Sequence, residues 1–391
     1  MSAATKFNSL LTQAKEVRAS FGRGLLSQMG DILSLRFGAG KLGAAEYYDY
    51  RLFDLPAQRR REFLGWRIED VLEDTLIDDY SRIVSIDKLT YYSMMQGLGF
   101  RIPRIHAIYH PAGRPFAGVP TLRDAADVER FLMDGMEYPF FGKPAYGGYG
   151  QGAASVESID RTTSRLILGG GQEVEAAEFA TNVPDRGGMG YVFQERLRVH
   201  PEIRKRSGSG VAGLRLMVLL RPAGPQLFRA VWKITSGANI TDNFSHGGSG
   251  NMLGSIALDS GLVTSAVAGT GLGQREVAQH PETGESLLGF RIPLWDEVVA
   301  ECLRAAPAFP GFLVQGWDVV VTEDGPLLLE LNMVGCADLH QIADHRGLRD
   351  EVFNAFVREL GLDENLRGPN WPRVRNPKTG RFGKRQAHWP Y

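Results

Sequence analysis

Three oxygen-bearing side chains late in the chain have the types and the spacing that suit a metal ion. Asp318 lies in the apolar run "GFLVQGWDVVV", and Glu330 and Asn332 end a second apolar run, "PLLLELN". The "EDG" between the runs signals a tight turn, so we expect a hairpin of two strands. Residues two apart on a strand face the same side, so Glu330 and Asn332 point together and the turn brings Asp318 across to them.

Carboxylate and amide oxygens are the ligands that hard cations such as Mg²⁺ prefer, with Mn²⁺ as the alternative metal. Each acid also has a simpler interpretation, as a half-solvated residue at a strand end. The surrounding runs are strongly apolar, however, and a buried carboxylate is costly unless it is paired or metal-bound. The triplet therefore favours a metal site, and a magnesium site in turn predicts a phosphorylated ligand.

A lysine followed by a glycine-rich loop supplies the other half of a phosphate site. In "FFGKPAYGGYGQG", Lys143 offers a compact ammonium group that suits phosphate oxygens. The spacing matches neither G-x-x-x-x-G-K-[ST] nor G-x-G-x-x-G, and an ordinary hairpin turn is the alternative. Glycines let backbone N–H groups approach an anion and let a loop close over it, and those of this loop are Gly147, Gly148, Gly150 and Gly152.

Further candidates lie between these motifs. Arg215 interrupts the apolar run "GLRLMVLL" and is expected to face a carboxylate substrate, a transferring phosphoryl group or a structural ion-pair partner. Lys233 in "AVWKIT" leaves the same alternatives open. His246 in the polar loop "NITDNFSHGGSGN" is a candidate general base or acceptor-orienting residue, with a solvated loop as the alternative. Cys336 is interpreted as a small packing residue.

The elements that must position these residues fall into distinct stretches. Residues 1–84 are expected to be mainly helical, since runs such as "NSLLTQAKEVRASF" place apolar residues at three- and four-residue spacing. The next stretch mixes strands and helices, including two long strands joined at "PAGP" and an amphipathic helix in "PLWDEVVAECLRAAPAF". Residues 363–391 are expected to be a basic extension, with seven Lys and Arg and no acid from Asn365 onward.

Composition excludes several classes of function. The 391 residues carry 44 Lys and Arg against 45 Asp and Glu, a net charge of −1 that gives no sign of a nucleic-acid partner. With only Cys302 and Cys336, the chain suits the reducing cytoplasm. Its first residues resemble neither a signal peptide nor a membrane span. No window of 18 uncharged apolar residues occurs, so any membrane role would have to be peripheral.

The order of the motifs resembles the ATP-grasp superfamily over about residues 85–350. The resemblance runs through Lys88 in "DKLTYY", Lys143 with its glycine-rich loop, Glu195 in "VFQERL", and Asp318 with the "ELN" that ends at Asn332. Within the superfamily the chain is most similar to the sugar-transfer-associated group, which is related to glutamate-ligase-like proteins. The segments "AAEYYDYRLFDL" and "NFSHGGSGN" carry this finer similarity.

The resemblance implies an α+β fold in which two lobes, residues 85–192 and 193–362, clamp ATP. It implies that Lys88 and Lys143 hold the phosphates. Backbone groups at the hinge between the lobes would bind adenine, and the ribose would bind beyond it; the residues implied are Gln194, Glu195 and Leu197 for adenine and Glu202 for ribose. Asp318, Glu330 and Asn332 would bind two Mg²⁺ ions, with Glu330 bridging them.

The resemblance also implies a reaction: a small-molecule carboxylate is activated as an acyl phosphate, which an amine-type acceptor then attacks. A phosphotransferase acting on a hydroxyl and a non-catalytic ATP-binding protein are the alternatives. One departure affects the acceptor: many family members follow E-x-N with a Pro-Gly turn, whereas this chain has Val334 and Gly335. An unusual acceptor pocket is therefore expected, and the sequence names neither substrate nor oligomeric state.

Overall fold

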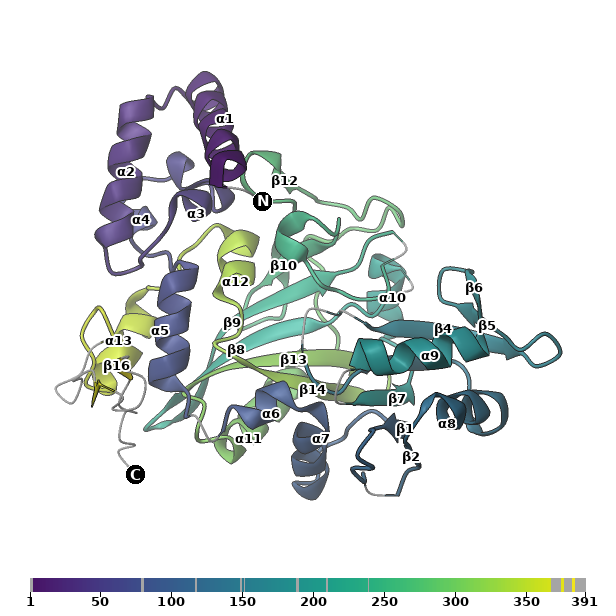
Figure 1. The fold of residues 1–391 in the computed structure, drawn as a ribbon. Helices are drawn as coiled ribbons and strands as arrows, with labels where there is room; N and C mark the ends of the chain where they lie inside the picture. The colour runs from purple at the N-terminus through teal and green to yellow at the C-terminus, as the bar shows by residue number, and fades with distance from the viewer. Residues whose placement is uncertain are drawn as a thin grey trace.

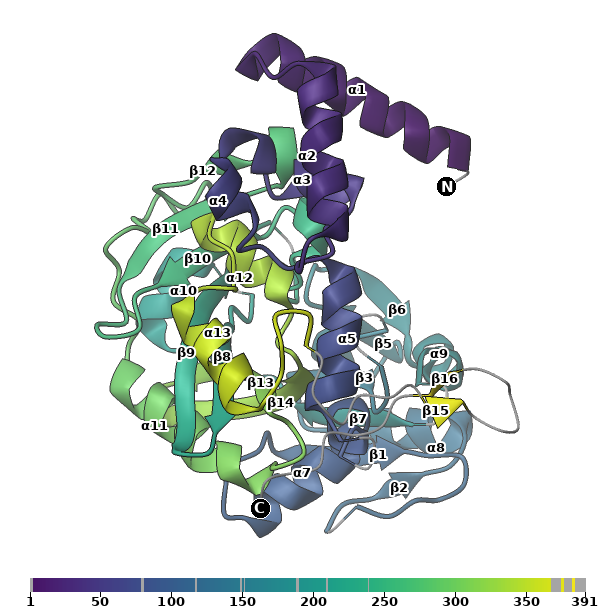
Figure 2. The same ribbon diagram turned by 90° about the vertical axis from the view of Figure 1, so that its left-hand side faces the viewer.

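The structure is a computed structural model that describes residues 3–78, 81–116, 118–147, 150, 152–187, 190–208, 210–237, 239–366, 374–375 and 382–383. A helical N-terminal region packs beside two lobes, each built on a large sheet (Figures 1 and 2). The α+β class and the N-terminal helical region predicted from the sequence are both confirmed.

The N-terminal region is a set of helices around a small aromatic core. Tyr47, Phe53 and Phe63 are buried there, and they belong to the same apolar cluster as Val231 and Leu253 of the second lobe. The region is therefore built onto the second lobe. Its elements are α1 (Ala3–Phe21), α2 (Leu25–Phe37), α3 (Ala44–Asp49), η1 (Leu52–Asp54), α4 (Ala57–Arg60), α5 (Trp66–Leu76) and α6 (Ile83–Ile86).

The first lobe contains a sheet with the strand order β2-β1-β7-β3-β4-β5-β6, in which β1 and β2 are parallel and the other pairs antiparallel. Phe140 and Phe193 are fully buried on the face that α8 and α9 cover. The strands are β1 (Ile105–Tyr109), β2 (Thr121–Leu122), β3 (Phe140–Pro144), β4 (Ala154–Asp160), β5 (Arg165–Leu168), β6 (Glu173–Glu175) and β7 (Tyr191–Glu195). The helices are α7 (Lys88–Gly97), α8 (Ala125–Arg130), η2 (Phe131–Gly135) and α9 (Ala176–Gly187).

The second lobe contains an antiparallel sheet with the order β12-β11-β10-β9-β8-β13-β14. Its strands are β8 (Leu214–Arg221), β9 (Gly224–Ile234), β10 (Met252–Ile256), β11 (Val263–Ala268), β12 (Arg275–Glu276), β13 (Val314–Thr322) and β14 (Gly325–Met333). Its helices are α10 (Pro201–Ser207), η3 (Ser245–Gly247), η4 (Gly271–Gly273), α11 (Trp295–Ala305), η5 (Ala306–Ala308), α12 (Ala337–Asp344) and α13 (Glu351–Glu359). The predicted hairpin, the predicted pair of long strands and the predicted amphipathic helix correspond to β13–β14, β8–β9 and α11.

Helices cover both faces of the second sheet. Consecutive strand residues face opposite sides. Trp232 shares one apolar cluster with Val298 of α11, whereas its neighbour Val231 shares another with Ile342 of α12. Figure 1 shows α11 and α12 on these two sides of the sheet. The α12 face is the one that also carries the charged residues of the candidate site.

The boundary that we placed between residues 192 and 193 falls inside β7, which belongs wholly to the first sheet. Within the basic extension, the structure describes a short antiparallel pair, β15 (Val374–Arg375) with β16 (Phe382–Gly383).

Within the described residues, every helix is too short or too polar to cross a lipid bilayer.

Candidate active site

The β13–β14 hairpin brings the predicted metal ligands together. Asp318 stands directly opposite Glu330, and Gly316 stands opposite Asn332. The register shifts immediately after Asp318, because Leu329 is an extra residue in β14. The row of polar residues formed by Asn332, Glu330 and Asp318 therefore ends at this bulge. The spacing argument from the sequence is confirmed: the three side chains share one face at the end of the hairpin away from its turn.

Two basic residues of neighbouring strands pair with Asp318. Arg215, its cross-strand partner on β8, donates from Nε to Oδ1 at 2.6 Å and from Nη2 to Oδ2 at 2.9 Å. Lys233 on β9 places Nζ 3.1 Å from Asp318 Oδ1 and 3.1 Å from Asp242 Oδ2. Of the alternatives for Arg215 and Lys233, the structural ion pair is the one these contacts form. The cluster of Arg215, Lys233, Asp318 and Asp242 is called the paired cluster below.

The pairing fixes the charge state of the paired cluster. Burial by itself would raise the pKa of Asp318, but Arg215 and Lys233 hold that pKa well below its usual value. Burial would likewise lower the pKa values of both cations, and their carboxylate partners raise them instead. Asp242 differs, since burial raises its pKa despite Lys233. Around neutral pH, Asp318 is therefore a carboxylate held in place by a bidentate guanidinium.

The second ionic group joins the two lobes. Lys143 on β3 places Nζ 3.3 Å from Oε1 of Glu330, and Lys88, the first residue of α7, places Nζ 3.6 Å from the same oxygen. The backbone N–H of Lys88 also donates to Ala145 O beside β3, at 3.0 Å. Asp87 caps α7 by accepting from the N–H of Leu89. The helix start is thus fixed against β3, and the two ammonium groups converge on one carboxylate.

The environments of these two lysines differ. Burial lowers the pKa of Lys88, and Glu330 offsets only part of this effect. Burial acts on Lys143 in the same direction, but Tyr92 and Glu330 raise its pKa above the usual value, and Nζ lies 5.5 Å from the Tyr92 ring centroid. For Glu330, burial opposes ionisation, yet Lys143 and Lys88 lower its pKa. Lys88, Lys143 and Glu330 are called the lysine cluster below.

The start of the glycine-rich loop lies against the lysine cluster. The carbonyl oxygen of Gly147 accepts a hydrogen bond from Lys88 Nζ at 2.7 Å, and Gly147 has a φ of +90°, which favours glycine. A Cβ at Gly150 would lie 3.3 Å from Oγ1 of Thr241 in the second lobe. The loop thus reaches across to the other lobe at Gly150. Gly148 lies outside the described residues.

The predicted hinge residues lie at the end of β7. The buried Gln194 accepts a hydrogen bond from the Tyr92 hydroxyl at 3.3 Å, and Leu197 packs on the main core. The N–H of Glu195 donates to Arg104 O at 2.9 Å, and its carboxylate accepts from Arg104 N at 2.8 Å. Glu202, the predicted ribose ligand, lies apart from this group: it is exposed in the first turn of α10, where it pairs with Arg206 at 2.8 Å.

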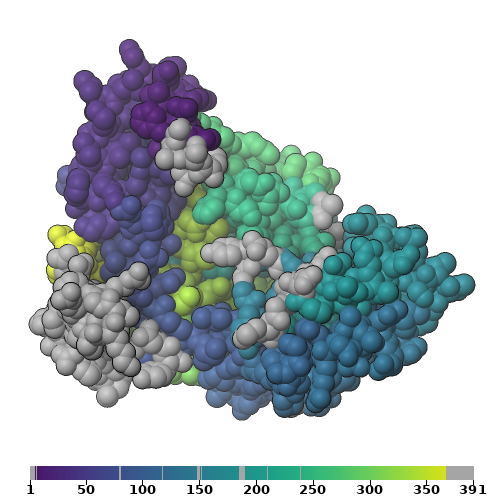
Figure 3. Space-filling model, in the orientation of Figure 1, coloured from purple at the N-terminus to yellow at the C-terminus, as the bar shows by residue number. Residues whose placement is uncertain are grey.

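His246 lies near the site but on its outer side. Its side chain is 81% exposed, and Nδ1 is 3.5 Å from Oδ2 of Asp338 in the first turn of α12. Beside Asp338, Glu69 of α5 accepts a hydrogen bond from the N–H of Ala337 at 2.8 Å. Burial, helped by Asp338, raises the pKa of Glu69 to about 8, and burial also raises that of Asp338. Figure 3 shows a hollow between the purple and blue N-terminal helices and the lobes, with the yellow-green β14–α12 segment visible inside it.

The segment after Asn332 is shaped by close backbone contact. A Cβ on Gly316 would lie 2.2 Å from the Cα of Gly335, so the turn lies directly on β13. Val334 and Cys336 both have left-handed φ values, +52° and +55°. Cys336 Sγ lies 3.2 Å from Nη1 of Arg215, so this residue contacts the paired cluster in addition to filling space.

Four residues of the site were missed in the sequence. Asp242 stands in the polar loop already singled out for His246, and Tyr92 follows Lys88 by one helical turn. A search for the counter-ion of Lys233 could have found Asp242 in the sequence. Glu69 and Asp338 gave no comparable local signal, because their proximity depends on how α5 packs against α12.

The donor chemistry of the hairpin fits Mg²⁺. Asn332 donates from Nδ2 to Asp318 Oδ2 at 3.4 Å, which leaves its amide oxygen as the coordinating atom. A carboxylate offers about four lone-pair sites, so Asp318 can accept from Arg215 and still bind a metal. Glu330 is 29% exposed, which keeps it accessible. In the described part of the chain, no group of three or more His, Cys, Asp or Glu forms a metal cluster, so the candidate site depends on the amide of Asn332 as its third ligand.

The two lobes, the lysine cluster between them and the D…E-x-N hairpin define an ATP-grasp fold. A model of one family within that superfamily, described as "Sugar-transfer associated ATP-grasp", matches residues 74–356. The chain therefore belongs to this family. None of the curated protein sequences matches the chain.

Solved structures with similar folds include amino-acid ligases. An L-amino acid ligase from Bacillus licheniformis matches with 13% identity and a TM-score of 0.38, over 71% of this chain and 51% of that one. D-alanine–D-alanine ligases from Bacillus anthracis and Helicobacter pylori match with 11% and 10% identity and TM-scores of 0.38 and 0.39; the matches cover 74% and 78% of this chain and 69% and 67% of theirs. The chain thus spans about half the length of the L-amino acid ligase. Likenesses at this level carry no information about what this chain binds.

Proposed function

We propose that the chain is an ATP-dependent ligase that activates a carboxylate as an acyl phosphate and joins it to an amine or similar nucleophile, releasing ADP and phosphate. The observation that carries this proposal is the convergence of Lys88 and Lys143, from the first lobe, on Glu330 of the second. Catalysis of phosphoryl transfer depends mainly on positioning and on neutralising charge. Two ammonium groups beside a candidate metal ligand are suited to both tasks.

In this proposal the lysine cluster receives the phosphates. Lys88 and Lys143 would contact phosphate oxygens, while Glu330, together with Asp318 and Asn332, would hold Mg²⁺. The metal, when bound, neutralises charge on the phosphoryl oxygens. The adenine would lie at the hinge that family membership implies, formed by Gln194, Glu195 and Leu197.

The paired cluster would orient the reaction. Arg215 holds both oxygens of Asp318, and Lys233 bridges Asp318 to Asp242. These contacts would hold Asp318 in place as a metal ligand. His246 lies beside Asp338, where an acceptor amine would approach from the hollow. Its exposure makes it a residue that orients the acceptor rather than one enclosed with the reacting groups.

Water must be kept from an acyl phosphate, because this intermediate hydrolyses readily. The glycine-rich loop starts against Lys88 at Gly147, and Gly150 approaches Thr241 of the other lobe. Closure of this loop over the phosphates would exclude water during transfer.

The test is a screen for ADP release with the full chain, ATP and Mg²⁺ over amino acids, sugar acids and peptides, with products read by mass spectrometry. A ligase forms free phosphate and a condensed product only when both co-substrates are present. A phosphorylated hydroxyl product without free phosphate would identify a phosphotransferase instead. ATP binding without turnover across the panel would identify a binding protein. Either of these two results would overturn the proposal.

A further inference from the structure

One face of α2 is apolar and exposed. Leu26, Met29, Leu33 and Phe37 recur at three- and four-residue spacing, so they share one side of the helix. Their exposed fractions are 80%, 55%, 54% and 79%. The opposite side of α2 buries Gln28 and Leu35 against the rest of the N-terminal region. The four exposed side chains are called the α2 stripe below.

Isolated exposed apolar residues are ordinary, but a contiguous stripe of large ones marks a contact surface. The stripe is also short: from Leu26 to Phe37 the helix rises about 17 Å, against about 30 Å for the hydrocarbon core of a bilayer. Figure 2 shows α1 and α2 projecting from the body of the molecule, so the stripe is on a protruding element rather than in a groove. A protruding stripe can lie flat on the surface of a partner, whereas a groove would be needed to receive a peptide.

The net charge of the N-terminal segment favours an anionic partner. Residues 1–43 contain six Lys and Arg and two acids, a net charge of +4, whereas the rest of the chain has 38 Lys and Arg against 43 acids, a net charge of −5. One of the two acids, Asp31, is 2.5 Å from Arg60. Two copies of the chain that met through their α1–α2 regions would bring like charges together, which disfavours a second copy as the partner.

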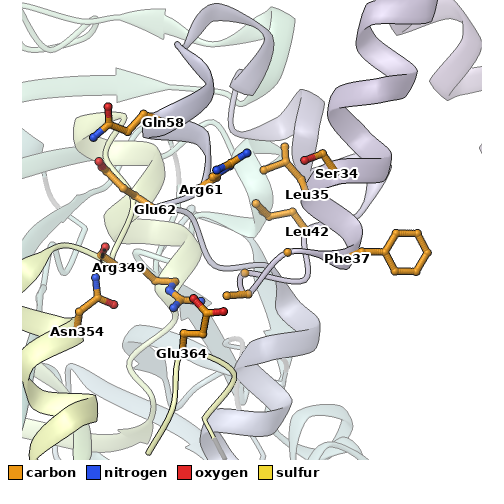
Figure 4. Close-up of a pocket in the computed structure, with 13 residues that line it drawn as sticks. Ser34, Leu35, Phe37, Leu42, Gln58, Arg61, Glu62, Arg349, Asn354 and Glu364 are labelled. Carbon is orange, nitrogen blue, oxygen red and sulfur yellow. Dashed lines mark hydrogen bonds between the residues drawn. The ribbon is translucent and has the colours of Figure 1, made fainter.

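Charged residues of both signs lie at the C-terminal end of the stripe. A cavity of about 560 Å³ between α2 and α13 is lined by Arg61 and Arg349, by Glu62 and Glu364, and by apolar residues that include Phe37. In Figure 4 the ring of Phe37 points away from the other lining side chains, toward the outside, where it extends the stripe. The apolar surface is therefore contiguous with a polar cavity that carries two guanidinium groups and two carboxylates.

We propose that the α1–α2 region docks the protein on an anionic lipid surface, with the α2 stripe in the interface and Lys and Arg of residues 1–43 against the headgroups. An amphipathic helix with an apolar face and basic flanks binds membranes in this way, without spanning them. The proposal is independent of the proposed ligase activity, because no residue of the stripe belongs to the candidate site.

The test measures co-sedimentation of the full chain with vesicles of phosphatidylcholine alone and of phosphatidylcholine mixed with phosphatidylglycerol. We expect binding to the anionic vesicles that weakens as salt is raised, and little binding to phosphatidylcholine alone. The double variant Leu26→Gln with Phe37→Gln should reduce binding by about tenfold or more, because two apolar side chains no longer enter the interface. Arg61→Gln should reduce binding to the anionic vesicles by about fivefold.

The matched control is Leu98→Gln with Leu288→Gln, two leucines that are 45% and 41% exposed outside the N-terminal region. This control variant should bind vesicles as strongly as the unchanged protein does. Thermal unfolding checks that every variant is folded. Failure to bind anionic vesicles, or equal losses in the control pair, would overturn the proposal. Light scattering that shows a dimer broken by the Leu26 and Phe37 changes would overturn it too, because the stripe would then join copies of the chain.

Discussion

The two ionic clusters of the site are built from similar residues but differ in how their charges balance. In the paired cluster, Arg215 and Lys233 face Asp318 and Asp242, two cations against two carboxylates. In the lysine cluster, Lys88 and Lys143 converge on Glu330, so among the described ion pairs there one positive charge is in excess. The paired cluster lies within the second lobe, whereas the lysine cluster joins two lobes.

This difference gives the two clusters different proposed roles: the paired cluster positions Asp318, and the lysine cluster binds an anion. A balanced, buried group of charges gains little by binding a further anion, so the paired cluster is suited to holding Asp318 in one place. A cluster with excess positive charge at a lobe interface is suited to an incoming anion, and a triphosphate with Mg²⁺ supplies both the negative charge and a partner for Glu330. Substitutions in the lysine cluster should therefore act mainly on nucleotide binding and turnover, and a substitution of Asp242 in the paired cluster mainly on stability.

The largest effect is expected from Glu330→Gln. Loss of this charge removes the proposed metal ligand and the common partner of both lysines, so turnover should fall about a thousandfold or more. Steady-state ADP release measures this effect. Glu323→Gln, the same change at an exposed position in the turn of the same hairpin, should leave turnover unchanged. Normal activity in Glu330→Gln, with the fold intact by circular dichroism, would remove Glu330 from the mechanism.

Lys143→Ala should weaken ATP binding about 10- to 100-fold, the range expected when a hydrogen bond to a charged group is lost. Isothermal titration calorimetry gives the affinity directly. Lys205→Ala, at an exposed ion pair with Glu285, is the control and should bind ATP normally. If the two variants bound ATP equally well, Lys143 and its loop would serve another ligand.

Asp242→Asn should act on stability instead. The change leaves Lys233 with Asp318 as its remaining carboxylate partner, and loss of one hydrogen bond between charged groups should cost about 2 kcal/mol of unfolding free energy. Urea unfolding measures this cost, with the exposed Asp324→Asn as a control near zero. A larger loss of ATP affinity than of stability would contradict the separation of the two clusters.

Glu69→Gln should change how stability depends on pH. The pKa of Glu69 is raised from 4.5 to about 8 in the folded protein, so the folded state binds a proton that the unfolded state has lost between these values. Stability from this group is complete below pH 4.5 and is lost as pH rises toward 8, with a slope approaching about 1.4 kcal/mol per unit. Unfolding of the Gln variant between pH 6 and pH 8 should lack this decline. An unchanged slope would show that Glu69 does not hold the proton.

Local pattern was enough to predict the hairpin and the placement of the three candidate ligands on it. The alternation that places Glu330 beside Asn332, and the tight turn that returns the chain to Asp318, both depend on residues close in sequence. The bulge at Leu329 and the insertion of β7 between β1 and β3 depend on how distant segments pack, and no local signal predicted either.

The dependence on distant packing also explains which residues could not be placed correctly from the sequence. Glu202 was chosen because it follows the hinge, but α10 begins at Pro201 and turns its carboxylate outward to Arg206. Glu69 reaches the start of α12 from a helix more than 250 residues earlier, so only the tertiary fold shows that they meet.

The most direct test of the central claim is the coupling between Mg²⁺ and Glu330 in ATP binding. Calorimetry would measure ATP affinity with and without Mg²⁺ in the unchanged protein and in Glu330→Gln. If Glu330 binds the metal beside the phosphates, Mg²⁺ should tighten ATP binding about tenfold or more in the former and leave it unchanged in the latter. The same gain from Mg²⁺ in both proteins would contradict the assignment of Glu330 and, with it, the site proposed between the lobes.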